Sequence, residues 1–165
     1  MQGLALFFLC VILLRAINVY NMRYISLSVG ETKKFAAELV KKNYPSKKGA
    51  LVFGLVGELG AGKTHFAQGA AVALGIKRNI TSPTFVLMKK YGISSGELKM
   101  MYHIDCYRLD SVRDILDLGW SKIILDRRNV VFVEWAEKIK SILPRDTILI
   151  FIKDLGGEKR EITID

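Results

Sequence analysis

The segment 57–64, GELGAGKT, constrains this chain most, because it matches the pattern G-x-x-x-x-G-K-[ST] at every fixed position. An apolar run of strand character, 50–56, leads into it, and a helix-like segment, 65–74, follows. Strand, glycine-rich loop and helix are the context in which this pattern forms a phosphate-binding loop. The glycines let backbone N–H groups turn toward a polyphosphate, and the helix N-terminus adds its partial positive charge. The segment therefore predicts a site for a nucleoside triphosphate.

Lys63 and Thr64 supply the polar side chains at the end of this loop. The Lys63 ammonium can reach the β- and γ-phosphates, and the Thr64 hydroxyl can ligate Mg²⁺. Such an ion needs an acidic partner, normally at the carboxyl end of a buried strand. The apolar run 130–133 is typical of a buried parallel strand, and Glu134 follows it directly. Glu134 is the first candidate for the metal; the alternative is a strand-end glutamate that faces solvent.

Asp105 is the second candidate acid. In the run His103-Ile104-Asp105 the two outer residues project on the same side of an extended chain. Asp105 could then position the attacking water or hold a metal-bound water. His103 could take part directly, although a histidine near a strand end is more often structural.

A hydroxyl-rich turn and three aromatic or basic residues have open roles. Thr81, Ser82 and Thr84 could form a switch-like loop that senses the γ-phosphate and Mg²⁺, or they form an ordinary turn. Trp135 could stack on a base or a partner, or pack in the core. Tyr107 and Arg108 either pack or anchor a phosphate or a partner.

The remaining chain mixes helices and strands throughout, which favours one α/β domain of three layers. Ser28 and Glu31 have the spacing of a capping box that opens a helix. Gly75 ends the helix after the loop, and Gly119 ends a short helix over 110–118. Further strands are expected at 24–27, 85–91, 98–104, 147–152 and 161–164.

The N-terminal segment 1–21 differs from the rest. Its apolar run 4–14 is too short for a spanning helix, which needs about 20 residues. An over-extended start with Met22 as the true first residue is the favoured interpretation. A targeting or anchoring segment and a buried extra helix are the alternatives. We therefore divide the chain into this extension and a single domain over 22–165, and expect no stable membrane partner.

The charge balance favours polyanionic partners, because 25 Lys and Arg face 16 Asp and Glu, a net charge of +9. The basic residues are scattered in pairs rather than gathered in one block, and together they are compatible with contact to RNA. Cys10 and Cys106 have no metal-binding spacing and no disulfide pattern, which suits a reducing cytosol.

Four segments together resemble the TsaE family, small bacterial ATPases of tRNA threonylcarbamoyladenosine biosynthesis. They are GELGAGKTHFAQG (57–69), TSPTF (81–85), YHIDCYRL (102–109) and VEWAEKI (133–139). The resemblance covers residues 22–165. It implies a P-loop NTPase three-layer sandwich with a mixed, mostly parallel central sheet, and binding of ATP and Mg²⁺ with weak intrinsic hydrolysis.

The resemblance also implies partners and residue roles. Family members act with TsaB and TsaD, and TsaD modifies adenosine 37 of tRNAs that read ANN codons. The ATPase would reset that complex and meet tRNA indirectly through it. A cytoplasmic location is expected, because an exported ATP-hydrolysing domain would lack its substrate. Thr64 and Glu134 would hold Mg²⁺, and Lys63, Asp105 and Glu134 would be catalytic. The expected nucleotide-binding residues are Gly57, Glu58, Leu59, Gly60, Ala61, Gly62, Lys63, Thr64 and His65, with Arg160 of the C-terminal hairpin.

Two other functions would use the same loop. A P-loop small-molecule kinase would need an acceptor pocket and an arginine-bearing lid, and no arginine-rich insertion stands between residues 110 and 130. A nucleotide-dependent interaction module would hydrolyse ATP only incidentally. Nucleotide binding is common to all three, so it does not separate them.

Overall fold

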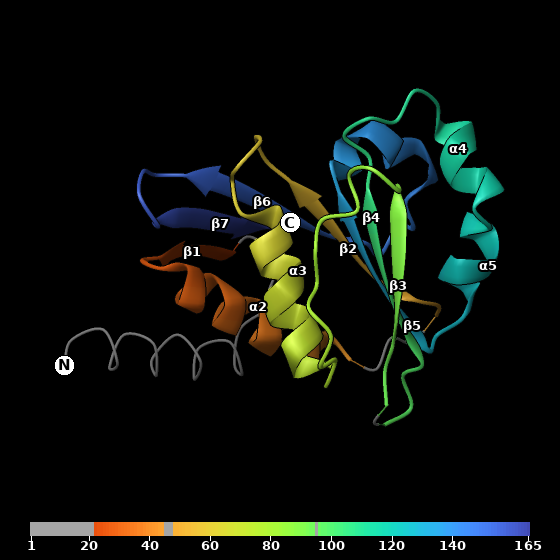
Figure 1. Ribbon diagram of the computed structural model, residues 1–165, viewed down its shortest axis with the longest axis horizontal. Coiled ribbons are helices and arrows are strands. Elements are labelled where there is room, and N and C mark those ends of the chain that lie inside the picture. The colour runs from red at the N-terminus through yellow and green to blue at the C-terminus, as the bar shows by residue number, and fades with distance from the viewer. Residues whose placement is uncertain (1–21, 45–47, 95) are drawn as a thin grey trace.

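The computed structural model describes residues 22–44, 48–94 and 96–165. The predictions made for segment 1–21 lie outside the described residues. A seven-stranded sheet in the order β1-β7-β6-β2-β5-β4-β3 forms the middle of the molecule (Figure 1). Its strands are β1 (Met22–Ser26), β2 (Leu51–Val56), β3 (Met88–Gly92), β4 (Met100–Asp105), β5 (Asn129–Glu134), β6 (Ile148–Asp154) and β7 (Arg160–Ile164).

The centre of the sheet is parallel and its edges are antiparallel. β2 pairs in parallel with β5 and β6, and β4 pairs in parallel with β5. β3 pairs antiparallel with β4, and β7 pairs antiparallel with β1 and β6. The fold class predicted from the sequence, an α/β domain with a mixed sheet that is mostly parallel in its centre, is confirmed.

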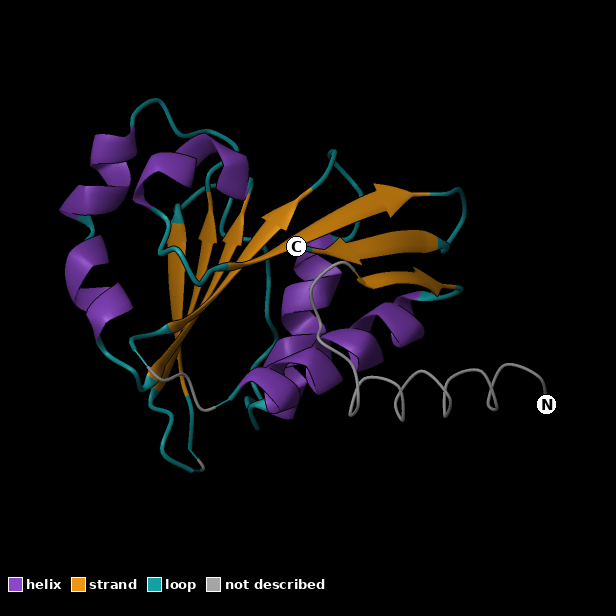
Figure 2. Ribbon diagram, turned by 180° about the vertical axis from the view of Figure 1, so that it is seen from behind, coloured by secondary structure: helices purple, strands orange, loops and turns teal. Residues whose placement is uncertain are grey.

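Helices cover both faces of the sheet, which makes three layers (Figure 2). α2 (Val29–Asn43) and α3 (Lys63–Ala73) pack over one hydrophobic core. α4 (Val112–Asp117), α5 (Trp120–Leu125) and the 3₁₀ helix η1 (Ala136–Ile142) pack over the other. The middle strands are apolar on both sides because both sides are covered. No helix within the described ranges is long and apolar enough to cross a membrane.

α2 and α3 approach each other closely at Gly69. A Cβ atom at this position would lie 2.2 Å from the Lys33 carbonyl oxygen, so only glycine fits there. The contact fixes α3, and with it the residues that follow the phosphate-binding loop, against the neighbouring helix.

The strand predicted from Phe85 was wrong in its first three residues. Phe85 is 83% exposed and belongs to a turn in which the Val86 N–H donates to the Pro83 carbonyl at 2.8 Å. Leu87 then has a φ of 62°, which breaks the extended chain before the ladder with β4 begins at Met88. The predicted strand 98–104 begins later, at Met100, and ends on Asp105.

The helix ends differ from the sequence predictions in small ways. Ser28 caps α2 by accepting a hydrogen bond from the Glu31 N–H at 3.1 Å. Glu31 Oε2 accepts from the N–H of Leu27 rather than of Ser28, so it reaches one residue beyond the capping box. The complete capping box belongs to α4, between Ser111 and Asp114. α5 and η1 were not predicted, because their segments are too short to show a helical period.

Candidate functional site

The loop between β2 and α3 has the backbone geometry of a phosphate-binding turn. Gly57, Gly60 and Gly62 have φ values of 155°, 81° and 104°, which L side chains rarely adopt. A Cβ at Gly57 would also lie 2.3 Å from the Ile152 carbonyl oxygen. Gly62 precedes α3 and provides no side-chain cap, so no cap occupies the first N–H groups of the helix. These N–H groups are the ones that bind anions at a helix N-terminus.

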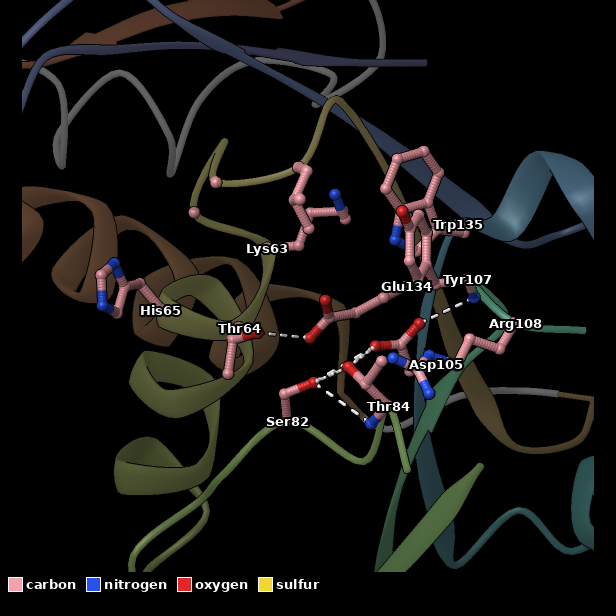
Figure 3. Close-up of a pocket in the computed structure, with 13 residues that line it drawn as sticks. Lys63, Thr64, His65, Ser82, Thr84, Asp105, Tyr107, Arg108, Glu134 and Trp135 are labelled. Atoms are coloured by element: carbon pink, nitrogen blue, oxygen red, sulfur yellow. Dashed lines mark hydrogen bonds between the residues drawn. The ribbon is translucent and has the colours of Figure 1, made fainter. Parts of the chain in front are cut away.

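A cavity of about 590 Å³ opens beside this loop (Figure 3). It lies where β4 and β5 end and α3 begins, the position at which parallel sheets usually bind ligands. Its lining residues are Leu59, Gly60, Gly62, Lys63, Thr64, His65, Ser82, Thr84, Asp105, Tyr107, Arg108, Glu134 and Trp135.

Lys63 is folded back onto its own loop. Its ammonium donates to the carbonyl oxygens of Gly57 at 2.6 Å and Glu58 at 2.8 Å. It also lies 4.1 Å from the centroid of the Trp135 ring, a cation–π contact. Burial lowers the pKa of Lys63, while the nearby Glu134 carboxylate opposes that shift. A phosphate in the cavity would replace the two carbonyl acceptors with charged ones.

Thr64 and Glu134 meet directly. The Thr64 hydroxyl donates to Glu134 Oε1 at 2.8 Å, and His103 Nε2 lies 2.8 Å from the same oxygen (the Thr64 bond is drawn in Figure 3). Glu134 is buried at the end of β5, so it does not face open solvent. The alternative of an exposed strand-end glutamate is therefore excluded.

Asp105 is held by three donors. One carboxylate oxygen accepts from the Ser82 hydroxyl at 3.2 Å and from the Thr84 hydroxyl, and the other accepts from the Tyr107 N–H at 2.8 Å (Figure 3). The hydroxyl-rich turn after residue 80 is thus tied to the end of β4. A carboxylate held this firmly at the cavity wall can orient a water molecule.

The oxygen atoms of Thr64 and Glu134 suit a magnesium ion. A hydroxyl and a carboxylate are hard donors, which Mg²⁺ prefers. No group of three or more His, Cys, Asp or Glu side chains within the described chain could hold a metal ion. Mg²⁺ usually keeps several waters and binds one or two protein groups together with substrate phosphates, so the pair fits that ion as part of a nucleotide complex.

Comparison with known proteins shows the family of this chain. The family model described as "Threonylcarbamoyl adenosine biosynthesis protein TsaE" matches residues 27–162. This chain belongs to the TsaE family.

Relatives and a solved structure support the membership. A TsaE protein of Treponema pallidum is 38% identical over 143 residues, which span 87% of this chain and 99% of that protein. A TsaE protein of Bacillus subtilis is 43% identical over 112 residues, 68% of this chain and 67% of that protein. Both are named as tRNA threonylcarbamoyladenosine biosynthesis proteins. The crystal structure of Bacillus subtilis YdiB matches with a TM-score of 0.64 and 34% identity, covering 90% of this chain and 87% of that one.

The structure brings most of the residues expected from the TsaE resemblance to one cavity. Of the expected nucleotide-binding residues, Leu59, Gly60, Gly62, Lys63, Thr64 and His65 line it, as do Asp105 and Glu134. Gly57, Glu58 and Ala61 do not line it, but Gly57 and Glu58 accept hydrogen bonds from Lys63 through their carbonyls. A role of these three residues in nucleotide binding stays a prediction.

Arg160 supports the loop and does not line the cavity. Its Nε donates to the Ala61 carbonyl at 2.9 Å, and its Nη1 lies 3.0 Å from Asp154 Oδ1. Arg160 thus contacts the loop between β2 and α3 from the β6–β7 hairpin. A direct contact between Arg160 and a nucleotide stays a prediction.

Two contacts beside the cavity were not anticipated. Lys138 of η1 donates to the Tyr107 carbonyl, and the Arg108 guanidinium lies 4.6 Å from the centroid of the Phe85 ring. No local pattern indicates either contact, because the partners come from separate elements. For the contact of Phe85, the turn that begins at Pro83 was the one local signal, and the strand predicted from Phe85 disregarded it.

Proposed function

We propose that this chain is an ATP-binding and hydrolysing component required for threonylcarbamoyl modification of adenosine 37 in ANN-decoding tRNAs. It would act in the cytoplasm with TsaB and TsaD type proteins and meet tRNA through their complex. The observation that carries the proposal is the hydrogen bond from Thr64 to Glu134 at 2.8 Å, in the cavity that the phosphate-binding loop opens onto. Family membership supports the pathway.

Each residue has a physical task under this proposal. Lys63 and the N–H groups of the loop would bind the phosphates. Thr64 and Glu134 would hold Mg²⁺, which neutralises phosphate charge as the terminal phosphate leaves. Asp105, held by Ser82 and Thr84, would orient the attacking water. The turn that carries those hydroxyls would therefore move with the state of the nucleotide.

The decisive experiment reconstitutes tRNA threonylcarbamoylation with TsaB and TsaD type proteins, with and without this chain. The chain 1–165 and a form starting at Met22 are compared, which tests whether the modification needs segment 1–21. We expect modification to depend on the chain and ATP hydrolysis to be slow alone and faster with the partners. A small-molecule kinase would instead transfer phosphate to an acceptor with no effect of the partners, and that result would overturn the proposal.

A further inference from the structure

His103 is a fully buried histidine at the edge of the candidate site. Its side chain is 0% exposed, and it does not line the cavity. It stands on β4 between Met101 and Asp105, on the same side of the strand, and it is opposite Phe132 of β5 in the register. The imidazole therefore lies behind the groups that a nucleotide in the cavity would touch.

Two donors from different elements converge on one oxygen. His103 Nε2 of β4 and the Thr64 hydroxyl of α3 each lie 2.8 Å from Glu134 Oε1. Both of these bonds fall on Oε1. The other oxygen of Glu134, Oε2, receives no hydrogen bond within the part of the chain that the structure describes, which leaves it for water or metal.

The acceptor dictates the tautomer of His103. A carboxylate oxygen accepts, so Nε2 carries the hydrogen that faces Glu134. Nδ1 is buried and has no hydrogen-bond partner among the described residues. An unpaired buried polar atom costs stability, and such atoms in a folded protein require an explanation. The polar contact that this side chain does make is the hydrogen bond from Nε2 to Glu134 Oε1.

We propose that His103 is a positioning residue that holds the Glu134 carboxylate for Mg²⁺. The proposal rests on the proposed function, in which Glu134 helps to hold that ion. Glutamate has three rotatable side-chain bonds, so a single contact does not fix its carboxylate. Thr64 sits at the start of α3, and its oxygen would face the ion when a nucleotide binds. His103 belongs to an inner strand of the sheet, so its hydrogen bond keeps Oε1 in place.

The test measures how ADP binding depends on Mg²⁺ concentration, by isothermal titration calorimetry of the full chain. For His103→Leu we expect the Mg²⁺ concentration at half-maximal effect to rise on the order of 10-fold. ADP affinity in EDTA should stay unchanged, because His103 touches no nucleotide group. His103→Gln, whose amide N–H can reach Oε1, should restore the wild-type Mg²⁺ dependence.

Met101→Leu is the matched control. Met101 is also fully buried on the same side of β4, but it makes no hydrogen bond to Glu134. This variant should lose stability without changing the Mg²⁺ dependence. Should His103→Leu fail to fold by circular dichroism, His103→Asn replaces it, since the shorter amide falls short of Oε1.

The outcomes separate this inference from the proposed function. If the wild-type chain binds ADP with no Mg²⁺ dependence, the proposed function fails at its metal site. If the wild type depends on Mg²⁺ and the leucine or asparagine variant shows the same dependence, the positioning role is overturned. Equal losses in His103→Leu and His103→Gln would also overturn it, because a merely structural histidine is not rescued by an N–H at that one position.

Discussion

At the scale of single residues, the candidate site is a set of polar groups that already have partners. The Lys63 ammonium bonds to two carbonyls and contacts Trp135, and the Glu134 carboxylate holds Thr64. A nucleotide must therefore exchange these contacts for its own. The exchange is favourable for Lys63 because hydrogen bonds to charged acceptors are stronger than those to neutral carbonyls.

Lys63→Ala tests this exchange. Losing a charged hydrogen bond costs about 2 kcal/mol, or roughly 30-fold in ADP affinity by calorimetry. ATP hydrolysis should nearly disappear. Lys122→Ala is the control, because Lys122 is exposed on α5 and does not line the cavity. Hydrolysis by Lys63→Ala at the wild-type rate would show that the site is assigned wrongly.

Replacing Glu134 and replacing Asp105 should impair different properties of the protein. Glu134→Ala removes a metal oxygen, so the Mg²⁺ needed for nucleotide binding should rise on the order of 10-fold or more. Asp105→Ala removes the group proposed to orient water, so it should lower the hydrolysis rate. It should change the Mg²⁺ concentration needed for nucleotide binding less than Glu134→Ala does. Binding and rate measured on both variants check this, and the opposite order would swap the two roles.

Trp135 should report nucleotide binding by its fluorescence. Its ring contacts the Lys63 ammonium, and it adopts a φ of 58° directly after Glu134. Trp120 is fully buried and donates to the Ile142 carbonyl, so Trp120→Phe isolates the Trp135 signal. ADP with Mg²⁺ should change the emission of this variant. The change is expected because Lys63 would leave the Trp135 ring to bind phosphate. Unchanged emission, alongside binding detected by calorimetry, would show that the Lys63 ammonium stays on the ring.

At the scale of elements, the contact between α2 and α3 positions the helix that carries Lys63 and Thr64. The two helices touch at Gly69, where the backbone of Lys33 leaves no room for a Cβ atom. α2 is in turn held at its start by the Ser28 cap and at its apolar face by the core. Moving α3 away from α2 would shift Thr64 from Glu134.

Gly69→Ala should therefore destabilise the fold by about 1–3 kcal/mol, the usual cost of overpacking. Gly30→Ala is a matched control in α2, because its Cβ would meet only Ser28 Oγ at 3.7 Å, an ordinary contact. Replacing that helical glycine should be neutral or stabilise by up to about 1 kcal/mol. Urea unfolding measures both. Equal midpoints for the two variants would contradict the close approach.

At the scale of the whole molecule, the parallel strands bring the site together. β2 leads into the phosphate-binding loop, β4 ends on Asp105 and β5 ends on Glu134. Because β2 and β4 both pair in parallel with β5, the carboxyl ends of these three strands lie side by side at the same end of the sheet. A ligand bound there would link β2, β4, β5 and α3, and should stabilise the fold as a unit.

ADP with Mg²⁺ should raise the melting temperature of the chain. At a free ligand concentration about 100 times Kd, the stabilisation is about 2.7 kcal/mol. For a domain of this size that corresponds to roughly 5–10 °C. Adding EDTA should remove part of the shift, and Lys63→Ala should remove most of it. A shift that is the same with and without EDTA would contradict Mg²⁺ binding beside the phosphates.

How much of this fold and site the sequence alone predicts depends on how far apart along the chain the interacting residues lie. The phosphate-binding loop, the helix cap at Ser28 and the candidates Glu134 and Asp105 could be predicted, because each depends on neighbours along the chain. The strand predicted from Phe85 was wrong, because the turn begun at Pro83 continues to Leu87 and overrides the β propensity of the intervening residues. Local patterns are reliable where no distant contact competes with them.

By itself, the sequence determined the loop that is predicted to bind phosphate, since closely spaced glycines, a lysine and a threonine set its backbone. Only the tertiary structure decided that the side chains of Thr64 and His103 both bond to Oε1 of Glu134. Thr64 and His103 lie 70 and 31 residues from Glu134, and they meet because β4 and β5 pair in parallel and α3 packs across the same face of the sheet. Sheet register and helix packing, which no short pattern encodes, make these side chains one site.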